Sequence, residues 1–213
     1  LYFCSMTATT PTTQGILKAA KVLENVIETT PLKLNEHLSE EFGAKIYLKR
    51  EDLQVVRSYK IRGAYNFMSQ LNSAQKKLGV VCASAGNHAQ GFAMSCSLLK
   101  IKGVVFMPVT TPKQKITAVE RLGKKYVEII LFGDTYDDAK SAALKYVQKE
   151  NKIFVPPFDH KLIIEGQGTV AAEILEQISK KKIDYVFVPI GGGGLAAGII
   201  TYFKEIAPST KII

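Results

Sequence analysis

The chain has no tryptophan, and only three of its 213 residues are cysteines. The cysteines are Cys4, Cys82 and Cys96, and no two of them form a CxxC motif. Their odd number disfavours a disulfide framework. Cys82 and Cys96 lie in apolar runs, so we expect small, buried hydrophobic side chains. This cysteine usage is typical of a reducing compartment, which predicts a cytoplasmic protein.

Long apolar runs, clustered histidines and nucleic-acid motifs are also missing. No uninterrupted apolar segment is long enough to span a membrane, and the three histidines are too far apart for metal-ligand spacing. We therefore expect no membrane span and no metal. The formal net charge is +9, but the lysine runs at 76–77, 124–125 and 180–182 fall at expected helix ends, which favour cations. Without aromatic residues between the basic ones, a nucleic-acid partner is not expected.

The sequence predicts different features at the two ends of the chain. Residues 1–6, LYFCSM, resemble the remnant of a cleavable expression tag, which leaves residues 7–213 for the fold. Residues 13–29 predict a leading helix that packs on the body. The last three residues, KII, begin another strand-like run, so we expect a truncated chain whose sheet is incomplete at the C-terminus.

From about residue 45, short β-branched runs alternate with longer amphipathic runs. Alternation of this kind predicts parallel strands with right-handed helical crossovers, hence an α/β fold with a doubly wound sheet and flanking helices. The expected strands are 45–49, 79–84, 103–108, 126–132, 152–156 and 184–190. The expected helices are 61–71, 87–99, 112–122, 135–150, 168–180 and 194–206.

The strongest chemical signal is the glycine run 191–194, between a strand of buried character and a helix. Glycine lets the backbone approach a ligand, and the first amides of a helix favour an anion, so the run predicts a phosphate cradle. The alternative is a tightly packed turn. Gly191, Gly193 and Ala196 also fit the dinucleotide pattern GxGxxA, but that pattern normally opens the first βαβ unit. Leu195 and Ala196 stand where a nucleoside-triphosphate loop needs lysine and serine or threonine.

Two further stretches complete the candidate site. SAGNH (84–88) also follows a strand and opens a helix, so its amides suit a carboxylate, although Asn87 is equally suited to capping the helix. Lys60 stands in RSYKIRG, where burial, the nearby Arg57 and Arg62 and a helix start would each lower its pKa. A lysine with a lowered pKa is a nucleophilic amine. An amine and a phosphate cradle together suggest pyridoxal phosphate.

The motifs TPLKL, LKREDLQ, RSYKIRGAYN, GVVCASAGNHAQG, PFDH, EGQGT and PIGGGGLAAG follow one another along nearly the whole chain. In this order they resemble the threonine dehydratases of the fold-type II pyridoxal-phosphate family. The resemblance implies a tryptophan-synthase-β-like fold, with a small subdomain of roughly residues 50–155 inserted in a larger one. It also implies that the catalytic region continues beyond residue 213, followed by a regulatory domain.

The resemblance further assigns roles to the candidate residues. Lys60 would carry pyridoxal 5'-phosphate covalently, Asn87 would hydrogen-bond its 3-hydroxyl, and Tyr59 would lie near its ring. The phosphate would be bound by Gly191, Gly192, Gly193, Gly194 and Leu195. The substrate carboxylate would be bound by Ser84, Ala85, Gly86, Asn87 and His88.

The implied reaction is dehydration and deamination of L-threonine to 2-oxobutanoate and ammonia, the first step of isoleucine biosynthesis, with serine as a possible second substrate. Racemases of this family have a serine at the position of Ala85, so alanine favours elimination. We expect a homodimer or homotetramer. The alternatives are a serine dehydratase or racemase, and a catalytically inactive fragment that only binds the ligand.

Overall fold

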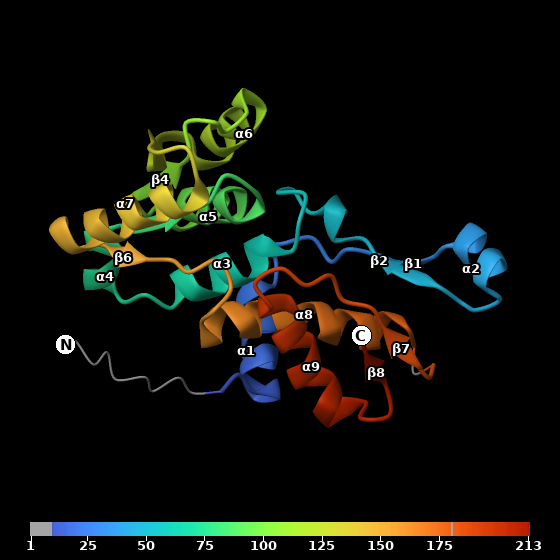
Figure 1. Ribbon diagram of the computed structural model, residues 1–213. Coiled ribbons are helices and arrows are strands. Elements are labelled where there is room, and N and C mark those ends of the chain that lie inside the picture. The colour runs from blue at the N-terminus through green and yellow to red at the C-terminus, as the bar shows by residue number, and fades with distance from the viewer. Residues whose placement is uncertain (1–9, 180) are drawn as a thin grey trace.

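A four-stranded parallel sheet forms one half of the molecule. The computed structural model describes residues 10–179 and 181–213, so the expected tag at 1–6 and Cys4 lie outside the described residues. The strands are Val80–Ala83 (β3), Gly103–Met107 (β4), Val127–Leu131 (β5) and Ile153–Phe154 (β6), in the order β5-β4-β3-β6 (Figure 1). The expected doubly wound parallel sheet is confirmed.

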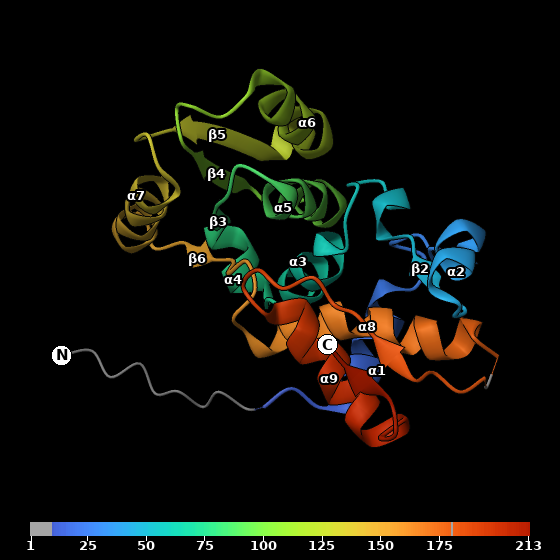
Figure 2. The same ribbon diagram turned by 45° about the vertical axis from the view of Figure 1, so that its right-hand side comes forward.

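Helices cover both faces of this sheet (Figure 2). One face packs against Asn87–Leu99 (α5) and Lys113–Gly123 (α6), and the other against Tyr136–Lys149 (α7). Side chains alternate along β3: Val80 and Cys82 join the core beneath α5, whereas Val81 and Ala83 join the core beneath α7. Two short elements complete this half, Ser73–Leu78 (α4) and the 3-10 turn Lys124–Tyr126 (η2).

The second half is built from helices. Lys161–Gln177 (α8) packs against Thr13–Leu23 (α1), Lys60–Ser69 (α3) and Gly194–Ile206 (α9), which lie around it in Figure 1. Glycines permit this close packing: a Cβ on Gly166 would lie 2.6 Å from the Arg62 carbonyl oxygen, and one on Gly198 would lie 2.6 Å from the Gly168 amide. Tyr185–Val186 (β7) and Lys211–Ile212 (β8) pair in parallel at the edge of this half, which confirms the strand expected at KII.

The N-terminal region differs from the expectation. The leading helix ends at Leu23, and Asn25 follows with a φ of 61°, which breaks the helix well before residue 29. The strand expected at 45–49 is Tyr47–Lys49 (β2), and it pairs antiparallel with Leu32–Leu34 (β1) rather than joining the parallel sheet. Between them lies Glu36–Phe42 (α2), which buries no residue and projects with the β1–β2 pair in Figure 1. The 3-10 turn Glu51–Leu53 (η1) leads from this arm toward α3.

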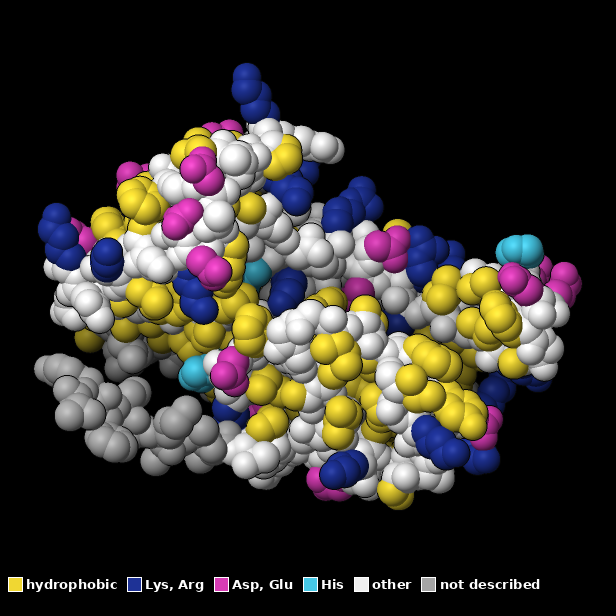
Figure 3. All heavy atoms as spheres, viewed as in Figure 1, with side chains coloured by type: hydrophobic (Ala, Val, Ile, Leu, Met, Phe, Trp, Pro, Cys, Tyr) yellow, Lys and Arg dark blue, Asp and Glu magenta, His cyan; other side chains and the backbone are white. Residues whose placement is uncertain are grey.

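The last strand before the glycine run is shorter and more exposed than expected. DYVFVPI predicts a buried strand, but only Tyr185–Val186 is regular, and Phe187 and Ile190 are 74% and 70% exposed. Within the described residues β7 pairs with β8 alone, so its other edge has no strand partner. Figure 3 shows hydrophobic side chains gathered over this lower part of the molecule.

The burial expected for two of the cysteines is confirmed. Cys82 and Cys96 are buried free thiols, and burial raises the pKa of each well above its ordinary value. In the described parts of the chain, no helix combines the length and apolar character needed to cross a bilayer.

Candidate active site

Lys60 is the first residue of α3, and its backbone amide lies 3.4 Å from the Ser58 hydroxyl oxygen. Its amine donates a hydrogen bond to the Pro157 carbonyl oxygen at 2.9 Å and lies 5.4 Å from the centre of the Tyr59 ring. The side chain is half-buried, and this burial lowers the pKa of the amine. A lowered pKa increases the neutral, nucleophilic fraction of a lysine, which is the property expected from the sequence.

The cause of this lowered pKa differs in part from the expectation. Burial accounts for the shift, and the two nearby arginines do not contribute. Arg57 is exposed to solvent. The Arg62 guanidinium is bound by Glu51 and Glu173, whose negative charges balance it. Residues two apart on a helix do not face each other, so Arg62 and Lys60 lie on different faces of α3.

The SAGNH loop joins β3 to α5 at the carboxyl edge of the parallel sheet. Gly86 occupies the N-cap position without a side-chain bond, and Asn87 is the first helical residue, so Asn87 does not cap the helix. The Ser84 hydroxyl accepts a hydrogen bond from the Gly86 amide at 3.2 Å. Asn87 is exposed, and Ala85 is partly exposed beside it. The polar groups of this loop thus lie at an accessible helix N-terminus, which suits an anion.

His88 is buried, unlike its neighbours in the loop. Its Nε2 lies 3.1 Å from the Val155 carbonyl oxygen, which fixes the ring as a donor at that nitrogen. Burial and the positive charge of Lys60 lower the pKa of His88 from 6.5 to about 4, so the ring is neutral near pH 7. A Cβ on Gly91, in the helix that this loop opens, would lie 2.9 Å from the Lys60 carbonyl carbon, so the start of α5 and the lysine are neighbours.

The glycine run lies at the start of α9. Gly193 has a φ of 82°, a left-handed conformation that glycine adopts without a Cβ penalty, and Gly194 opens the helix. A Cβ on Gly192 would lie 2.2 Å from the Phe158 ring, whereas one on Gly191 would meet nothing within 4 Å. Leu195 is buried in the core of the helical half. The run therefore combines a turn that requires glycine with an open backbone surface beside a helix N-terminus.

One short segment, Val155 to Phe158, connects all three motifs. Its Val155 carbonyl bonds His88, its Pro157 carbonyl bonds the Lys60 amine, and Phe158 packs against the glycine run. The three predicted stretches, far apart in the sequence, thus converge where the parallel sheet meets the helical half. The sequence predicted a strand at 152–156 and offered PFDH only as part of the resemblance, so the role of this segment in the site was missed, because backbone carbonyls leave no signal in residue type.

The EGQGT stretch lies inside α8 and serves packing. Glu165 is buried and accepts a hydrogen bond from the Thr12 amide at 3.2 Å, and Gln167 accepts one from the Gly63 amide at the same distance. Thr169 accepts a bond from Arg62 at 3.0 Å. These contacts join α8 to α3 and to the segment before α1.

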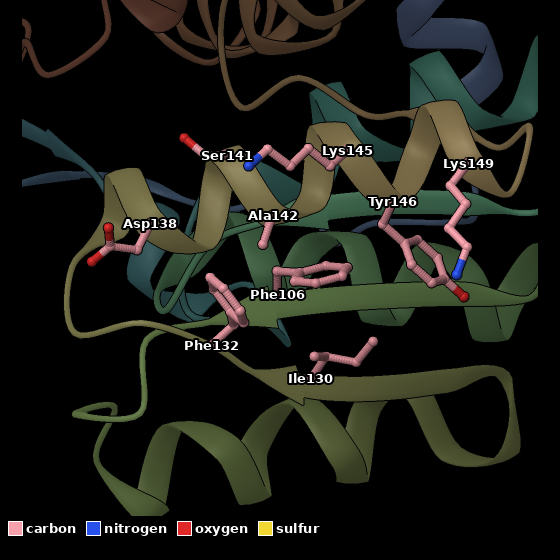
Figure 4. A pocket seen from close by; sticks show the side chains of 9 residues that line it. All are labelled: Phe106, Ile130, Phe132, Asp138, Ser141, Ala142, Lys145, Tyr146 and Lys149. Atoms are coloured by element: carbon pink, nitrogen blue, oxygen red, sulfur yellow. The ribbon is translucent and has the colours of Figure 1, made fainter.

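A separate groove lies elsewhere on the sheet, between α7 and the β4–β5 pair (Figure 4). It has a volume of about 540 Å³, and Phe106, Phe132 and Tyr146 provide its aromatic lining. None of the candidate site residues lines it. The groove is therefore distinct from the place where Lys60 and the two loops converge.

Comparison with known proteins identifies the family. The family described as "Pyridoxal-phosphate dependent enzyme" matches residues 23–213, which is most of the chain. The chain belongs to this family. The resemblance and the cofactor expected from the sequence are thereby confirmed.

Individual members of the pyridoxal-phosphate family are also similar to the chain. It is 52% identical over 198 residues to the "L-threonine dehydratase biosynthetic IlvA" of Bacillus subtilis, covering 93% of this chain and 47% of that protein. The solved structure of the processed form of threonine deaminase isoform 2 from Solanum lycopersicum has a TM-score of 0.86 and 44% identity, with 96% of this chain and 60% of that one covered. A maize serine racemase has a TM-score of 0.89 at 31% identity, with 95% and 60% covered. The chain spans about half the length of the curated relatives it matches.

Proposed function

We propose that this chain carries the lysine-bearing part of a threonine dehydratase, which converts L-threonine to 2-oxobutanoate and ammonia by β-elimination. The convergence of Lys60 with the two helix N-termini carries the proposal. The amine has a lowered pKa and lies beside a segment that also contacts both loops. Similarity to the dehydratase of Bacillus subtilis and the deaminase of Solanum lycopersicum supports the substrate.

The residues fit pyridoxal 5'-phosphate. We propose that the backbone amides of Gly191–Gly194 and Leu195, at the N-terminus of α9, bind its phosphate, because the left-handed Gly193 and the open Gly191 leave room for an anion. Asn87 would hold the ring hydroxyl, and Tyr59 would lie beside the ring. When bound, this cofactor supplies an electron sink that stabilises negative charge at the substrate α-carbon.

The substrate carboxylate would be bound at the start of α5. Ser84, Ala85, Gly86, Asn87 and His88 form this turn, and its free backbone amides suit an anion. Because the His88 ring is buried against Val155, its backbone amide rather than its imidazole would contact the carboxylate. The freed Lys60 amine would then accept the proton from the α-carbon, which requires a neutral amine and hence a lowered pKa.

Serine racemase is the second candidate, because the maize enzyme has the same fold at a TM-score of 0.89. Ala85 argues against it: an alanine side chain has no proton to deliver to the α-carbon. We also propose the small subdomain of roughly residues 50–155, since the four-stranded sheet and its helices lie in this range. The homo-oligomeric state and the cytoplasmic location remain predictions.

Borohydride fixation tests the proposal. The chain is incubated with pyridoxal 5'-phosphate, reduced, digested and analysed by mass spectrometry. We expect the cofactor's mass on the peptide that carries Lys60, no such label in Lys60→Ala, and full labelling in Lys204→Ala, which changes an exposed lysine. Labelling that persists at the same level in Lys60→Ala would refute the assignment.

Ketoacid release then separates the candidate activities. With L-threonine, release of 2-oxobutanoate supports the dehydratase. Formation of D-serine from L-serine without ketoacid supports the racemase. Specific labelling of Lys60 with neither product identifies this chain as a binding unit without activity.

A further inference from the structure

The most deeply buried charged group of the described residues is the guanidinium of Arg62, which has no exposed surface. Its Nε and Nη2 donate to the two carboxylate oxygens of Glu51 at 2.8 and 2.7 Å. Its Nη1 and Nη2 donate to the two oxygens of Glu173 at 2.6 and 3.0 Å, and Nη1 also donates to the Thr169 hydroxyl at 3.0 Å. All five N–H groups of the guanidinium therefore have an acceptor.

The surrounding groups balance this charge. Lys49 pairs with Glu173 and also donates to the Thr30 carbonyl oxygen, while the Thr30 hydroxyl donates to Glu51. Two cations and two carboxylates give a cluster with no net charge. Bidentate pairs between arginine and carboxylate fix orientation as well as distance. The cluster therefore holds α3 against η1 on one side and against α8 on the other.

The start of α3 depends on this anchor. The N-cap residue, Tyr59, provides no side-chain cap bond, and the first turn contains no acidic residue. The other hydrogen bonds of this turn are the long contact between the Lys60 amide and the Ser58 hydroxyl, a bond from the Arg62 amide to the Tyr59 carbonyl at 3.0 Å, and the bond from the Gly63 amide to Gln167. Arg62 is the third helical residue, so its two bidentate pairs fix the first turn, from whose other face the Lys60 side chain projects.

We propose that Arg62 is a positioning residue for the Lys60 amine: its forked bonds to Glu51 and Glu173 fix the first helical turn so that the amine reaches the Pro157 carbonyl. Arg62 touches none of the groups assigned to the reaction, so its effect passes through the backbone of α3. This inference rests on the proposed role of Lys60. It adds a specific requirement: a planar, bidentate cation, rather than positive charge alone, at position 62.

The experiment compares three variants of the cofactor-free chain. Arg62→Lys keeps the charge but loses the fork, while Glu51→Gln and Glu173→Gln each leave one bidentate pair. Arg50→Lys is the matched control, because Arg50 makes the same forked pair with Asp52 on the surface. Circular dichroism verifies the fold, and competitive acetylation with mass spectrometry measures the reactivity of Lys60 against pH, relative to exposed Lys204.

We expect the folded variants to move the midpoint of Lys60 reactivity to higher pH, because a displaced amine is less buried. The titratable groups beside the amine are Tyr59 and His88, and these substitutions leave both in place. Cofactor fixation at Lys60 should slow by roughly tenfold to a hundredfold, since a displacement of about 1 Å from reacting geometry has effects of this size. Arg50→Lys should behave as the unchanged chain.

The outcomes are distinct. A folded Arg62→Lys, Glu51→Gln or Glu173→Gln whose Lys60 profile matches that of the unchanged chain overturns the proposal. Loss of fold in all three also overturns it, because Arg62 would then serve the fold without a separable positioning effect. A shifted profile in a chain that never binds the cofactor retains this inference and refutes the proposed function instead.

Discussion

His88 contributes to the acid sensitivity of the folded state, and His88→Gln should remove that contribution. The imidazole is buried against the Val155 carbonyl, and burial and the Lys60 charge lower its pKa from 6.5 to about 4. In the unfolded chain the pKa returns to its ordinary value. Between pH 6.5 and 4 the unfolded state therefore binds more protons than the folded state, and stability falls as the pH falls.

The size of the effect follows from the shift. A difference of about 2.5 units at about 1.4 kcal/mol per unit gives roughly 3 kcal/mol once the pH is below 4. At pH 5, where the unfolded histidine is almost fully protonated and the folded one is mostly neutral, about 2 kcal/mol is lost relative to pH 8. Glutamine has no titrating group, and its amide N–H can donate to the Val155 carbonyl.

The assay is urea unfolding followed by circular dichroism at pH 8 and pH 5. The unchanged chain and His88→Gln share the losses that come from carboxylates and from His160, whose pKa burial also lowers, so the difference between the two losses isolates His88. His37→Gln is the matched control, because the His37 side chain is 88% exposed. Equal pH dependence in the unchanged chain and His88→Gln would refute the reasoning, since a buried neutral imidazole requires a difference.

Four further substitutions test the packing around the site, three by thermal or urea unfolding and Gly192→Ala by cofactor fixation. Gly91→Ala places a Cβ 2.9 Å from the backbone at the start of α3, so we expect a loss of about 1–3 kcal/mol. Gly192→Ala drives a Cβ into the Phe158 ring at 2.2 Å and should weaken cofactor fixation, whereas Gly191→Ala meets nothing within 4 Å and should leave stability unchanged. Arg62→Met leaves two mostly buried carboxylates without their main partner and should cost about 3–5 kcal/mol. Unchanged unfolding midpoints in Gly91→Ala and Arg62→Met would contradict the packing described at α3.

Much of the parallel sheet could be predicted from sequence, because its strands and helices each have a local signal. The helix expected at 87–99 begins and ends at those residues, and the helix expected at 135–150 is Tyr136–Lys149, with Thr135 as its N-cap. Both glycine-containing loops were placed at helix starts for the same reason. Periodicity and capping are properties of neighbouring residues, so a single sequence contains them.

Pairing partners and exposure are different, because they depend on residues far away in the chain. The run KIYLK at 45–49 was expected to join the parallel sheet, yet it pairs antiparallel with β1. The run at 184–190 has the composition of a buried strand, yet Phe187 is 74% exposed. Composition indicates that a strand is favourable, but the neighbour of each strand decides its direction and burial.

The candidate site shows the same division. The motif around Lys60 singled out this lysine. The prediction that Arg57 and Arg62 contribute to its lowered pKa was wrong. Charge in a sequence carries no information about pairing, and Arg62 is paired with two carboxylates that lie 11 and 111 residues away in the chain. Once those partners neutralise it, burial accounts for the shift.

The prolines of the segment Val155 to Phe158 explain how that burial is compatible with hydrogen bonding. Pro156 and Pro157 have no N–H groups to satisfy and hold φ near one value, which lowers the entropic cost of ordering the segment. Its carbonyl oxygens are then free to accept from outside the segment, and two of them bind His88 and Lys60. The Pro157 carbonyl accepts a hydrogen bond from one N–H of the half-buried Lys60 amine. A carbonyl has no net negative charge, so it does not stabilise the protonated amine as a carboxylate would. This arrangement lowers the pKa of Lys60 while keeping the amine aimed, which an ion pair at the same place would not do.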